Sequence, residues 1–221
     1  SGCGKSSLLR VLAGLDNTYT GIVALDGQPI RGISSRIGLI FQEPRLFPWL
    51  RVEQNVAFGL RHLRRETPAV EHPLQVARHW LARVGLQDFG RHYPKECSGG
   101  MAQRVALARG LAVHPEVLLL DEPFSALDAF IRMQLQDLLL SLWRDTGVTI
   151  LIVTHDLDEA LYLCDRILVM RGQPGVLHRT VSVAIHRPRH RGDAQLAALK
   201  ERILEMLDLT RPPEADTEYV I

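Results

Sequence analysis

Two short, uninterrupted apolar runs limit most strongly what this chain can fold into. Val117–Leu120 leads into Asp121, and Val148–Val153 leads into Thr154 and His155. A strand with one face in water would alternate apolar and polar residues, so these runs predict strands buried on both faces. Segments with apolar residues at helical spacing separate the two runs. Strands that alternate with helices in this way predict an α/β fold with a mostly parallel sheet.

The same reasoning places the other elements around this sheet. Apolar spacing predicts helices at Lys5–Leu15, Val52–Val84 (interrupted near Pro68 and Pro73), Met101–Ala112, Leu127–Leu142 and Leu196–Met206. Turn residues predict hairpins in Gly21–Ile30 and Ile167–Leu177, and a turn at Ser98–Gly100. Ile37–Phe41 is expected to be a buried strand that ends at Gln42. The proline-rich, acidic tail from Thr210 is expected to be disordered.

Composition and charge exclude several classes of protein. The 26 Lys and Arg residues and the 25 Asp and Glu residues leave a formal net charge of +1, without the basic surplus that indicates nucleic-acid binding. Apolar runs such as Ile150–Val153 fall far short of the roughly 20 residues that a membrane-spanning helix needs. Cys3, Cys97 and Cys164 are odd in number and widely spaced, which indicates a reducing compartment and fits neither a zinc site nor a redox pair.

The segment Ser1–Ser7 has the composition of a phosphate-binding loop. Glycines allow backbone N–H groups to close on phosphate oxygens, Lys5 can neutralise the terminal phosphates, and the Ser6 hydroxyl can bind Mg²⁺. The helix expected after it would point free N–H groups at the phosphates. So short a pattern also arises by chance, and by itself it does not decide the function.

The beginning of the chain carries an expectation of its own. The full phosphate-loop pattern starts with a glycine that would lie two places before Ser1. We therefore expect the sequence to begin inside the motif, with the strand that feeds the loop preceding it. Burial of the facing strands would then be incomplete. The chain as printed is expected to bind ATP weakly and to aggregate.

Two adjacent acids follow the first apolar strand. A phosphate loop must be paired with a carboxylate that holds Mg²⁺, and Asp121 at the end of a buried strand fits that role. Glu122 could polarise a water molecule for attack on a γ-phosphate. The alternative is a pair of helix-capping acids.

An ordered set of motifs accompanies the loop and the acids. Phe41-Gln42-Glu43, Ser98–Arg104, Ser125–Asp128 and Thr154-His155-Asp156 occur in that order. Together the motifs resemble the ATP-binding subunits of ABC transporters: Walker A, Q-loop, signature, Walker B, D-loop and H-loop. The resemblance covers nearly the whole chain. It implies a P-loop NTPase core with an inserted α-helical subdomain at about 48–97, and a C-terminal extension at about 186–221 with a helix and a tail.

The resemblance implies a role for each matching residue. Contacts with ATP are implied for Ser1, Gly2, Cys3, Gly4, Lys5, Ser6, Ser7 and Asp128, and for Ser98, Gly99 and Gly100 across a dimer. Mg²⁺ would be held by Ser6, Gln42 and Asp121. Catalysis would involve Glu122 as the base, His155 at the γ-phosphate, and Gln42 at the attacking water.

The resemblance also implies partners and a location. The working unit would be a head-to-tail homodimer with two ATP molecules at its interface. It would dock on a separate membrane permease at the cytoplasmic face of the bacterial inner membrane, as a peripheral protein. A periplasmic solute-binding protein would be an indirect partner. A non-transport ABC ATPase of DNA repair or ribosome function and a non-hydrolysing binding module remain as alternatives.

Three segments narrow the resemblance. Glu43–Trp49, Asp137–Trp143 and the basic run His186–Arg191 are similar to importers of sulfonates, taurine and nitrate, most of all to the aliphatic sulfonate type. Taurine, nitrate or another solute remains open. Trp49, with Arg45 and Leu46, would form a permease-docking pocket or belong to the subdomain core.

Some features depart from the family pattern or carry no function. Cys97 and Met101 stand where the signature usually has Leu and Gln, and Met cannot offer the hydrogen bonds of Gln. We interpret the basic run as a solvated, flexible link and the cluster Arg61, Arg64 and Arg65 as a solvated helix face.

Overall fold

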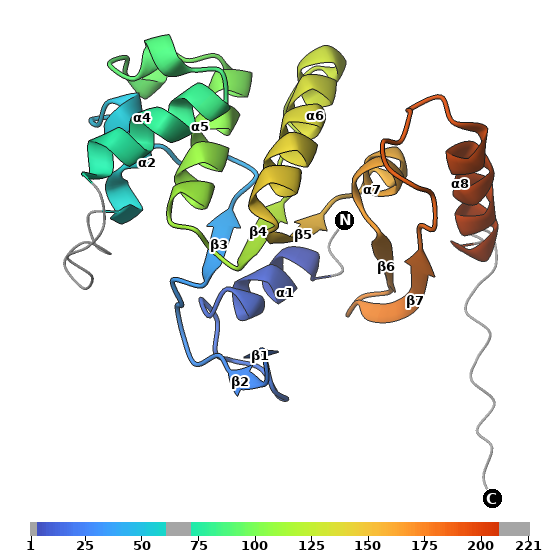
Figure 1. Ribbon diagram of the computed structural model, residues 1–221. Coiled ribbons are helices and arrows are strands. Elements are labelled where there is room, and N and C mark those ends of the chain that lie inside the picture. The colour runs from blue at the N-terminus through green and yellow to red at the C-terminus, as the bar shows by residue number, and fades with distance from the viewer. Residues whose placement is uncertain (1–3, 61–71, 208–221) are drawn as a thin grey trace, which may run out of the picture. The chain divides into compact units, whose positions relative to one another are not determined.

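The computed structural model describes residues 4–60 and 72–207 (Figure 1). The predictions for Ser1–Cys3, for the Arg61–Arg65 cluster, for the break near Pro68 and for the tail from Thr210 lie outside these residues. The helices are α1 (Lys5–Leu12), α2 (Val52–Val56), α4 (Pro73–Arg83), α5 (Gly99–Ala112), α6 (Ala129–Thr146), α7 (Leu157–Leu163) and α8 (Ala194–Leu207), with short helices η1 (Gln87–Phe89) and η2 (Pro94–Glu96). The strands are β1 (Ala24–Leu25), β2 (Gln28–Pro29), β3 (Ile37–Ile40), β4 (Val117–Asp121), β5 (Thr149–Val153), β6 (Arg166–Arg171) and β7 (Val176–Ser182).

The predicted parallel sheet is present as β3-β4-β5. Strand β4 is the middle strand and pairs in parallel with both neighbours, with Leu120 opposite Ile40 on one side and Ile152 on the other. Because all three strands run in one direction, their carboxyl ends share one edge of the sheet. Asp121 at that edge is paired with Val153, so the residues that follow β4 and β5 emerge side by side.

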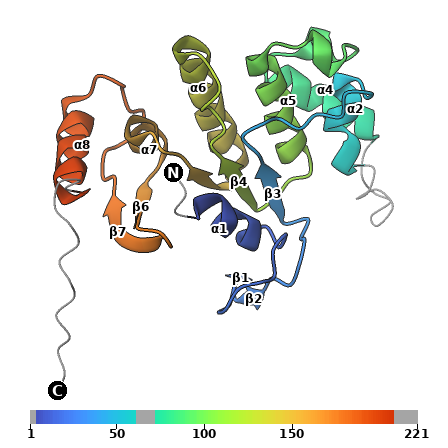
Figure 2. The same ribbon diagram turned by 180° about the vertical axis from the view of Figure 1, so that it is seen from behind.

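Helices pack on both faces of this sheet, as predicted (Figures 1 and 2). Leu9 of α1 packs with Leu119 and Val153 on one face. On the other face α5 approaches β3 closely, and a Cβ added to Gly110 would lie 3.1 Å from the Ile40 side chain. Successive side chains of β4 point to opposite faces of the sheet, and helices cover both faces. The side chains on both faces of β4 therefore pack against helices, which explains the uninterrupted apolar sequence of this strand.

Helix α1 is shorter than the sequence predicts and ends at Leu12. Gly14 adopts a left-handed φ of 69°. The N–H of Leu15 donates to the Arg10 carbonyl, and that of Gly14 to Val11. These bonds form a Schellman motif, which closes the helix although apolar spacing continues to Leu15.

Two other boundaries differ from expectation for reasons of capping. Gly99 and Gly100 belong to the first turn of α5 rather than to a turn before it, because the Ser98 side chain caps the helix by accepting the Met101 N–H. Pro73 begins α4 rather than interrupting a helix. Proline fits a first helical turn, where its missing N–H has no intrahelical partner to lose.

The predicted hairpin at Asp26-Gly27 is confirmed. Strands β1 and β2 pair in antiparallel fashion around these two residues, which have φ values of 51° and 75°. Positive φ at both central positions is the requirement of a type I′ turn, which Asp-Gly meets well.

The described residues divide into two compact units. The second unit comprises Asp156–Val169 and the residues from His178 onward, and the first comprises the rest. The helices of the segment 48–97 belong to the first unit with the sheet, and their status as a separate subdomain stays a prediction. In the second unit, Leu161, Ile167, Leu196 and Ile203 form a core with Val183 and Ala160.

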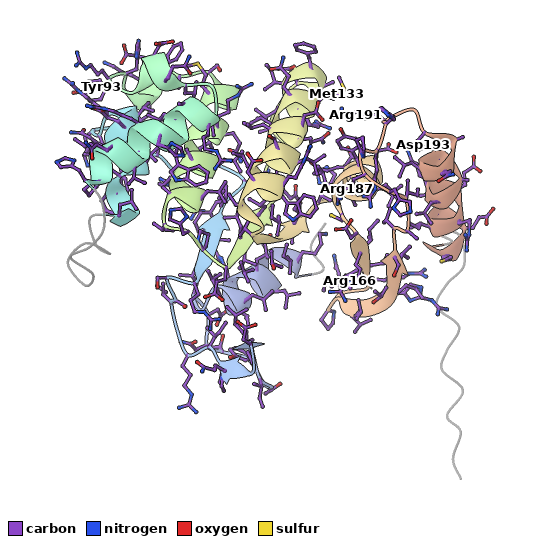
Figure 3. All side chains as sticks on the ribbon, viewed as in Figure 1. Tyr93, Met133, Arg166, Arg187, Arg191 and Asp193 are labelled. Atoms are coloured by element: carbon purple, nitrogen blue, oxygen red, sulfur yellow. The ribbon has the colours of Figure 1, made fainter. Side chains whose placement is uncertain are left out.

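The basic run in this second unit is not the solvated link that the sequence suggested. The Arg189 side chain is only 1% exposed. Its guanidinium donates to the carbonyls of Leu161, Cys164 and Val183, and it also contacts Asp165. Arg187, labelled in Figure 3, donates to the Leu163 carbonyl and to Asp165. The run therefore satisfies the last carbonyls of α7, which a helix leaves without partners of its own.

Across residues 4–60 and 72–207, no helix combines the length and the apolar character needed to cross a membrane.

Candidate functional site

Predicted site residues meet at the carboxyl edge of the parallel sheet. Gln42 follows β3 by two residues, Asp121 ends β4, and His155 follows β5 by two residues. The start of α1 reaches the same edge, where the Ser6 hydroxyl donates to Asp121 Oδ1 at 2.9 Å. Residues 115 positions apart in the sequence are thus in direct contact. In open α/β sheets this edge is the usual place for a ligand.

Within the phosphate-loop segment, the structure describes Gly4 and the residues that follow it. Gly4 precedes α1 with a φ of 93°, a conformation that L side chains rarely adopt. Lys5 is the first residue of α1, so the free N–H groups of the helix begin at the loop. Ser7 lies in the same first turn and is exposed. The contacts expected from Ser1, Gly2 and Cys3 lie outside the described residues.

Glu122 has an unusual backbone conformation next to the metal-site candidate. Its φ is 46°, while its N–H donates to the Val153 carbonyl at 2.9 Å. A non-glycine residue in the left-handed region costs on the order of 1 kcal/mol or more, and such residues cluster at functional sites. The carboxylate is 25% exposed, and its Oε2 lies 3.0 Å from His155 Nδ1. Parallel pairing of β4 and β5 therefore brings the predicted base, Glu122, into contact with His155, which is predicted to lie at the γ-phosphate.

Ser125 joins the Q-loop glutamine to this centre. Gln42 Nε2 donates to Ser125 Oγ at 3.1 Å, and Ser125 Oγ donates to the Glu122 carbonyl oxygen at 3.0 Å. Sequence reasoning quoted Ser125 within the D-loop motif but gave it no role. The signal was its position three residues after Glu122, which suits a hydroxyl that closes a turn onto that carbonyl.

The signature residues form a second cluster, at the start of α5 and α6. Ser98 caps α5, and a Cβ added to Gly100 would lie 2.6 Å from the Ile131 side chain of α6. Asp128 caps α6, because its Oδ1 accepts the N–H groups of Phe130 and Ile131. Gly100 is thus required by the close approach of α6, and Asp128 has a structural task whether or not it also contacts ATP.

The two departures from the signature pattern are structurally mild. Cys97 is half-buried, and burial, followed by the nearby Glu96, raises the pKa of its thiol. Met101 contributes its backbone N–H to the Ser98 cap at 3.2 Å. The cap therefore uses the Met101 backbone and not its side chain.

The donor set at the sheet edge suits a hard divalent cation. A hydroxyl and a carboxylate, Ser6 and Asp121, converge to hydrogen-bonding distance. The described part of the chain contains no group of three His, Cys, Asp or Glu side chains arranged to hold a metal. Mg²⁺ does not need such a cage, because it is commonly held by one or two protein oxygens together with phosphate oxygens. Ser6 and Asp121 fit that pattern.

Comparison with known families decides the class of this chain. The family model described as "ABC transporter" matches residues 1–125, which include the phosphate loop, Gln42, the signature, Asp121 and Glu122. The chain belongs to the ABC transporter family. Membership confirms the resemblance drawn from the motifs, the P-loop α/β fold, and the enzyme class, an ATPase.

Curated members of the family extend the similarity over most of the chain. The "Aliphatic sulfonates import ATP-binding protein SsuB 1" of Xanthomonas axonopodis pv. citri is 54% identical over 94% of this chain and 81% of its own length. The SsuB protein of Bacillus anthracis, which has the same descriptive name, is 45% identical over 94% of this chain and 80% of its own length.

Solved structures of family members share the fold. One is the dimeric post-hydrolysis state of the ATP-binding cassette MJ0796 bound to ADP and Pi. It has a TM-score of 0.71 and 30% identity, and the match covers 83% of this chain and 82% of that one. Another is CbiO1 of Clostridium perfringens, part of the transporter complex CbiONQ, with a TM-score of 0.71 and 26% identity over 96% of this chain and 81% of that one.

Proposed function

We propose that this ATPase drives the import of aliphatic sulfonates through a separate membrane permease. The observation that supports hydrolysis is the meeting of Ser6, Asp121, Glu122 and His155 at one sheet edge, next to the start of α1. The support for the solute is the name shared by relatives that are 44–54% identical. The proposals of import and of the solute are thus supported by the relatives alone. The proposal of ATP hydrolysis is also supported by the geometry of the site.

The chemistry would be attack of water on the γ-phosphate. Lys5 and the N–H groups at the start of α1 would bind phosphate oxygens and neutralise developing charge. Ser6 and Asp121 would hold Mg²⁺, with Gln42 close by, and the ion would supply further charge neutralisation. Glu122 would accept the proton of the attacking water. Its contact with His155 supports a shared task, since one imidazole could orient the carboxylate and reach the γ-phosphate.

The proposed working form is a head-to-tail homodimer. In such a dimer Ser98, Gly99 and Gly100 of one subunit would face the ATP held by the other, with Asp128 nearby. The N-terminus of α5 carries a partial positive charge, which suits a γ-phosphate. The dimeric state described for MJ0796, bound to ADP and Pi, supports this arrangement.

The proposed permease-docking surface is an aromatic cluster near the Q-loop. Phe47 lies 4.5 Å from Phe58 and 5.6 Å from Trp49 between ring centroids. Trp49 is 70% exposed, so it is not a core residue. An exposed aromatic anchor suits a short apolar helix of a permease. This docking would place the ATPase at the cytoplasmic face of the inner membrane, with a periplasmic solute-binding protein as an indirect partner.

A growth experiment tests the proposed function. Cells that lack the gene are expected not to grow on an alkanesulfonate as the only sulfur source, yet to grow on sulfate, and the intact gene should restore growth. The Trp49→Ala variant should restore little growth while retaining ATPase activity. Normal growth of the deletion strain on alkanesulfonates, with a defect on taurine or nitrate, would assign a different solute.

A further inference from the structure

The side chain of Arg109 connects two regions that sequence reasoning treated separately. Arg109 lies near the end of α5, the helix that Ser98 caps. Its Nη1 donates to the Arg45 carbonyl at 2.9 Å, and its Nη2 donates to the Pro44 carbonyl at 2.7 Å. Burial lowers the pKa of this guanidinium. Two successive carbonyls of the Q-loop segment therefore replace part of the water that Arg109 has lost.

The backbone of Arg45 is shaped for this contact. Its φ is 47°, in the left-handed region that residues other than glycine seldom occupy. Its guanidinium stacks over the Phe41 ring at 3.9 Å from the ring centroid. The carbonyls of Pro44 and Arg45 both accept from one guanidinium, so the left-handed turn and the Arg109 contact support each other.

Two further contacts hold the same segment, and both come from other elements. Gln42 is held by Ser125, as described above. Asn55 is fully buried, and its side chain accepts the Phe47 N–H at 2.8 Å and donates to the Leu50 carbonyl at 3.0 Å. Residues 42–50 are thus attached at both ends, and Arg109 attaches their middle to α5.

We propose that Arg109 is a positioning residue that makes the Q-loop segment move together with the signature helix. The inference rests on the proposed function, because it concerns how ATP hydrolysis reaches the permease. Gln42 at one end of the segment lies at the catalytic edge, and Trp49 near the other end is exposed. With Arg109 in place, a displacement of α5 shifts Pro44 and Arg45 as well. Without it, α5 and the docking surface respond separately.

Another arginine on the same helix provides a matched control. Arg104 also holds a backbone carbonyl, that of Val84, at 3.2 Å, and it contacts Gln134 of α6. These partners lie outside the Q-loop segment. Loss of Arg104 therefore removes an arginine–carbonyl contact of α5 and leaves the attachment of Pro44 and Arg45 intact.

The test compares Arg109→Met, Arg109→Lys and Arg104→Met in the full chain assembled with its permease. Basal ATPase of the free subunit, the KM for ATP, the melting temperature and the solute transported per ATP are measured for each. For Arg109→Met we expect basal turnover and KM within about twofold of wild type, and at least a fivefold fall in solute transported per ATP. Lysine keeps the charge but has a single donor nitrogen in place of Nη1 and Nη2, so Arg109→Lys should recover part of the loss. Arg104→Met should leave the transport ratio unchanged.

Several outcomes would overturn the inference. One is that Arg109→Met leaves the solute transported per ATP unchanged, and another is that Arg104→Met lowers it equally. A third is that the solute transported per ATP falls in proportion to the melting temperature across all three variants. If Arg109→Met does not fold, the ratio in Arg109→Lys decides, and an unchanged ratio there counts against the proposal. Absence of ATP-driven transport by the wild-type complex would instead reject the proposed function, which keeps the two failures separate.

Discussion

Two groups of polar residues in this chain make different kinds of contact in the structure. At the sheet edge, side chains contact other side chains: Ser6 meets Asp121, and Glu122 meets His155. In the basic run, Arg189 is buried and contacts mainly backbone carbonyls. Contacts in which at least one side chain is exposed, as in both of these pairs, can be exchanged for a ligand at low cost. If a guanidinium that donates to buried carbonyls is removed, those carbonyls lose their hydrogen bonds while still buried, which destabilises the fold.

The comparison shows why charge clusters are poor evidence for function when taken by themselves. A polar group that contacts other side chains can belong to a site that is available to a ligand. A polar group that contacts backbone carbonyls acts as a structural clamp. The following predictions test this distinction, beginning with the largest expected effect.

Glu122→Gln should reduce ATP turnover by about a hundredfold or more, because glutamine keeps the shape of the side chain and cannot accept the proton from water. The stability of the fold should change little, since Glu122 is only partly buried and its contact is with the exposed side chain of His155. Phosphate release measures turnover, and size-exclusion chromatography with ATP and Mg²⁺ should show a dimer that persists. Glu43→Gln, an exposed acid next to Gln42, is the control and should retain turnover. Wild-type turnover in Glu122→Gln would remove this residue from the mechanism.

Arg189→Met should destabilise the second unit by about 3 kcal/mol, because several buried carbonyls lose their donor at once. Hydrogen exchange of the α7 amides measures the local stability. The matched control is Arg191→Met: Arg191 is exposed and stacks on Tyr162 at 4.1 Å, so its loss should cost well under half as much. Equal effects in the two variants would contradict the distinction between a buried clamp and an exposed contact.

Much of the first group could be predicted from the sequence, and little of the second. Gln42, Asp121 and His155 lie at or just after the ends of strands. Because the carboxyl ends of parallel strands share one edge of the sheet, these residues come together whatever the conformation of the loops. Arg189 differs because three of its acceptors are the carbonyls of Leu161, Tyr162 and Cys164, which lie 25 to 28 positions earlier at the end of α7. Every residue has a backbone carbonyl, so the sequence does not show which carbonyls accept hydrogen bonds from a side chain. The pattern of charged residues therefore could not distinguish a buried clamp from a solvated link.

The contacts of Arg109 and Ser125 escaped sequence reasoning for a related reason. Arg109 reaches carbonyls 64 and 65 residues away, and Ser125 accepts from a glutamine 83 residues away. The end of α1 was missed for a local reason, since the Schellman motif at Gly14 overrides apolar spacing. Tertiary partners and capping thus account for the main differences between expectation and structure.

Cys164 offers a smaller test of how tightly the second unit is closed. Burial, opposed by Arg187 and reinforced by Asp165, raises the pKa of its thiol to about 11. At pH 8 its thiolate fraction is then about a hundredfold lower than that of a thiol with the ordinary pKa of 9.0. Alkylation of the native chain at pH 8 should therefore be far slower at Cys164 than at Cys97, as measured by mass spectrometry of the labelled peptides.

The same pKa shift has a consequence for stability. The folded state keeps the Cys164 proton to higher pH than the unfolded state does, so this group stabilises the fold below pH 9.0. That contribution declines as the pH rises from 9.0 toward about 11. Arg189→Met should speed labelling of Cys164 and leave Cys97 unaffected. Rapid labelling of Cys164 in the wild-type chain would mean that the clamp opens readily.

The smallest effect is expected for Met101→Gln in the signature, where the question is again whether backbone or side chain makes the contact. Ser98 Oγ accepts the Met101 N–H, and this cap does not involve the Met101 side chain. Met101→Gln restores the usual family residue and should change ATP turnover by no more than about twofold, because the cap and the free N–H groups of α5 remain. Ser98→Arg should abolish turnover, since it removes the cap and introduces bulk and charge where a second subunit's γ-phosphate would lie. Steady-state phosphate release at saturating ATP compares the two. A severe and equal loss in both variants would mean that the side chain at position 101 contacts nucleotide directly, and that the distinction drawn from the sheet edge and the basic run does not extend to the signature.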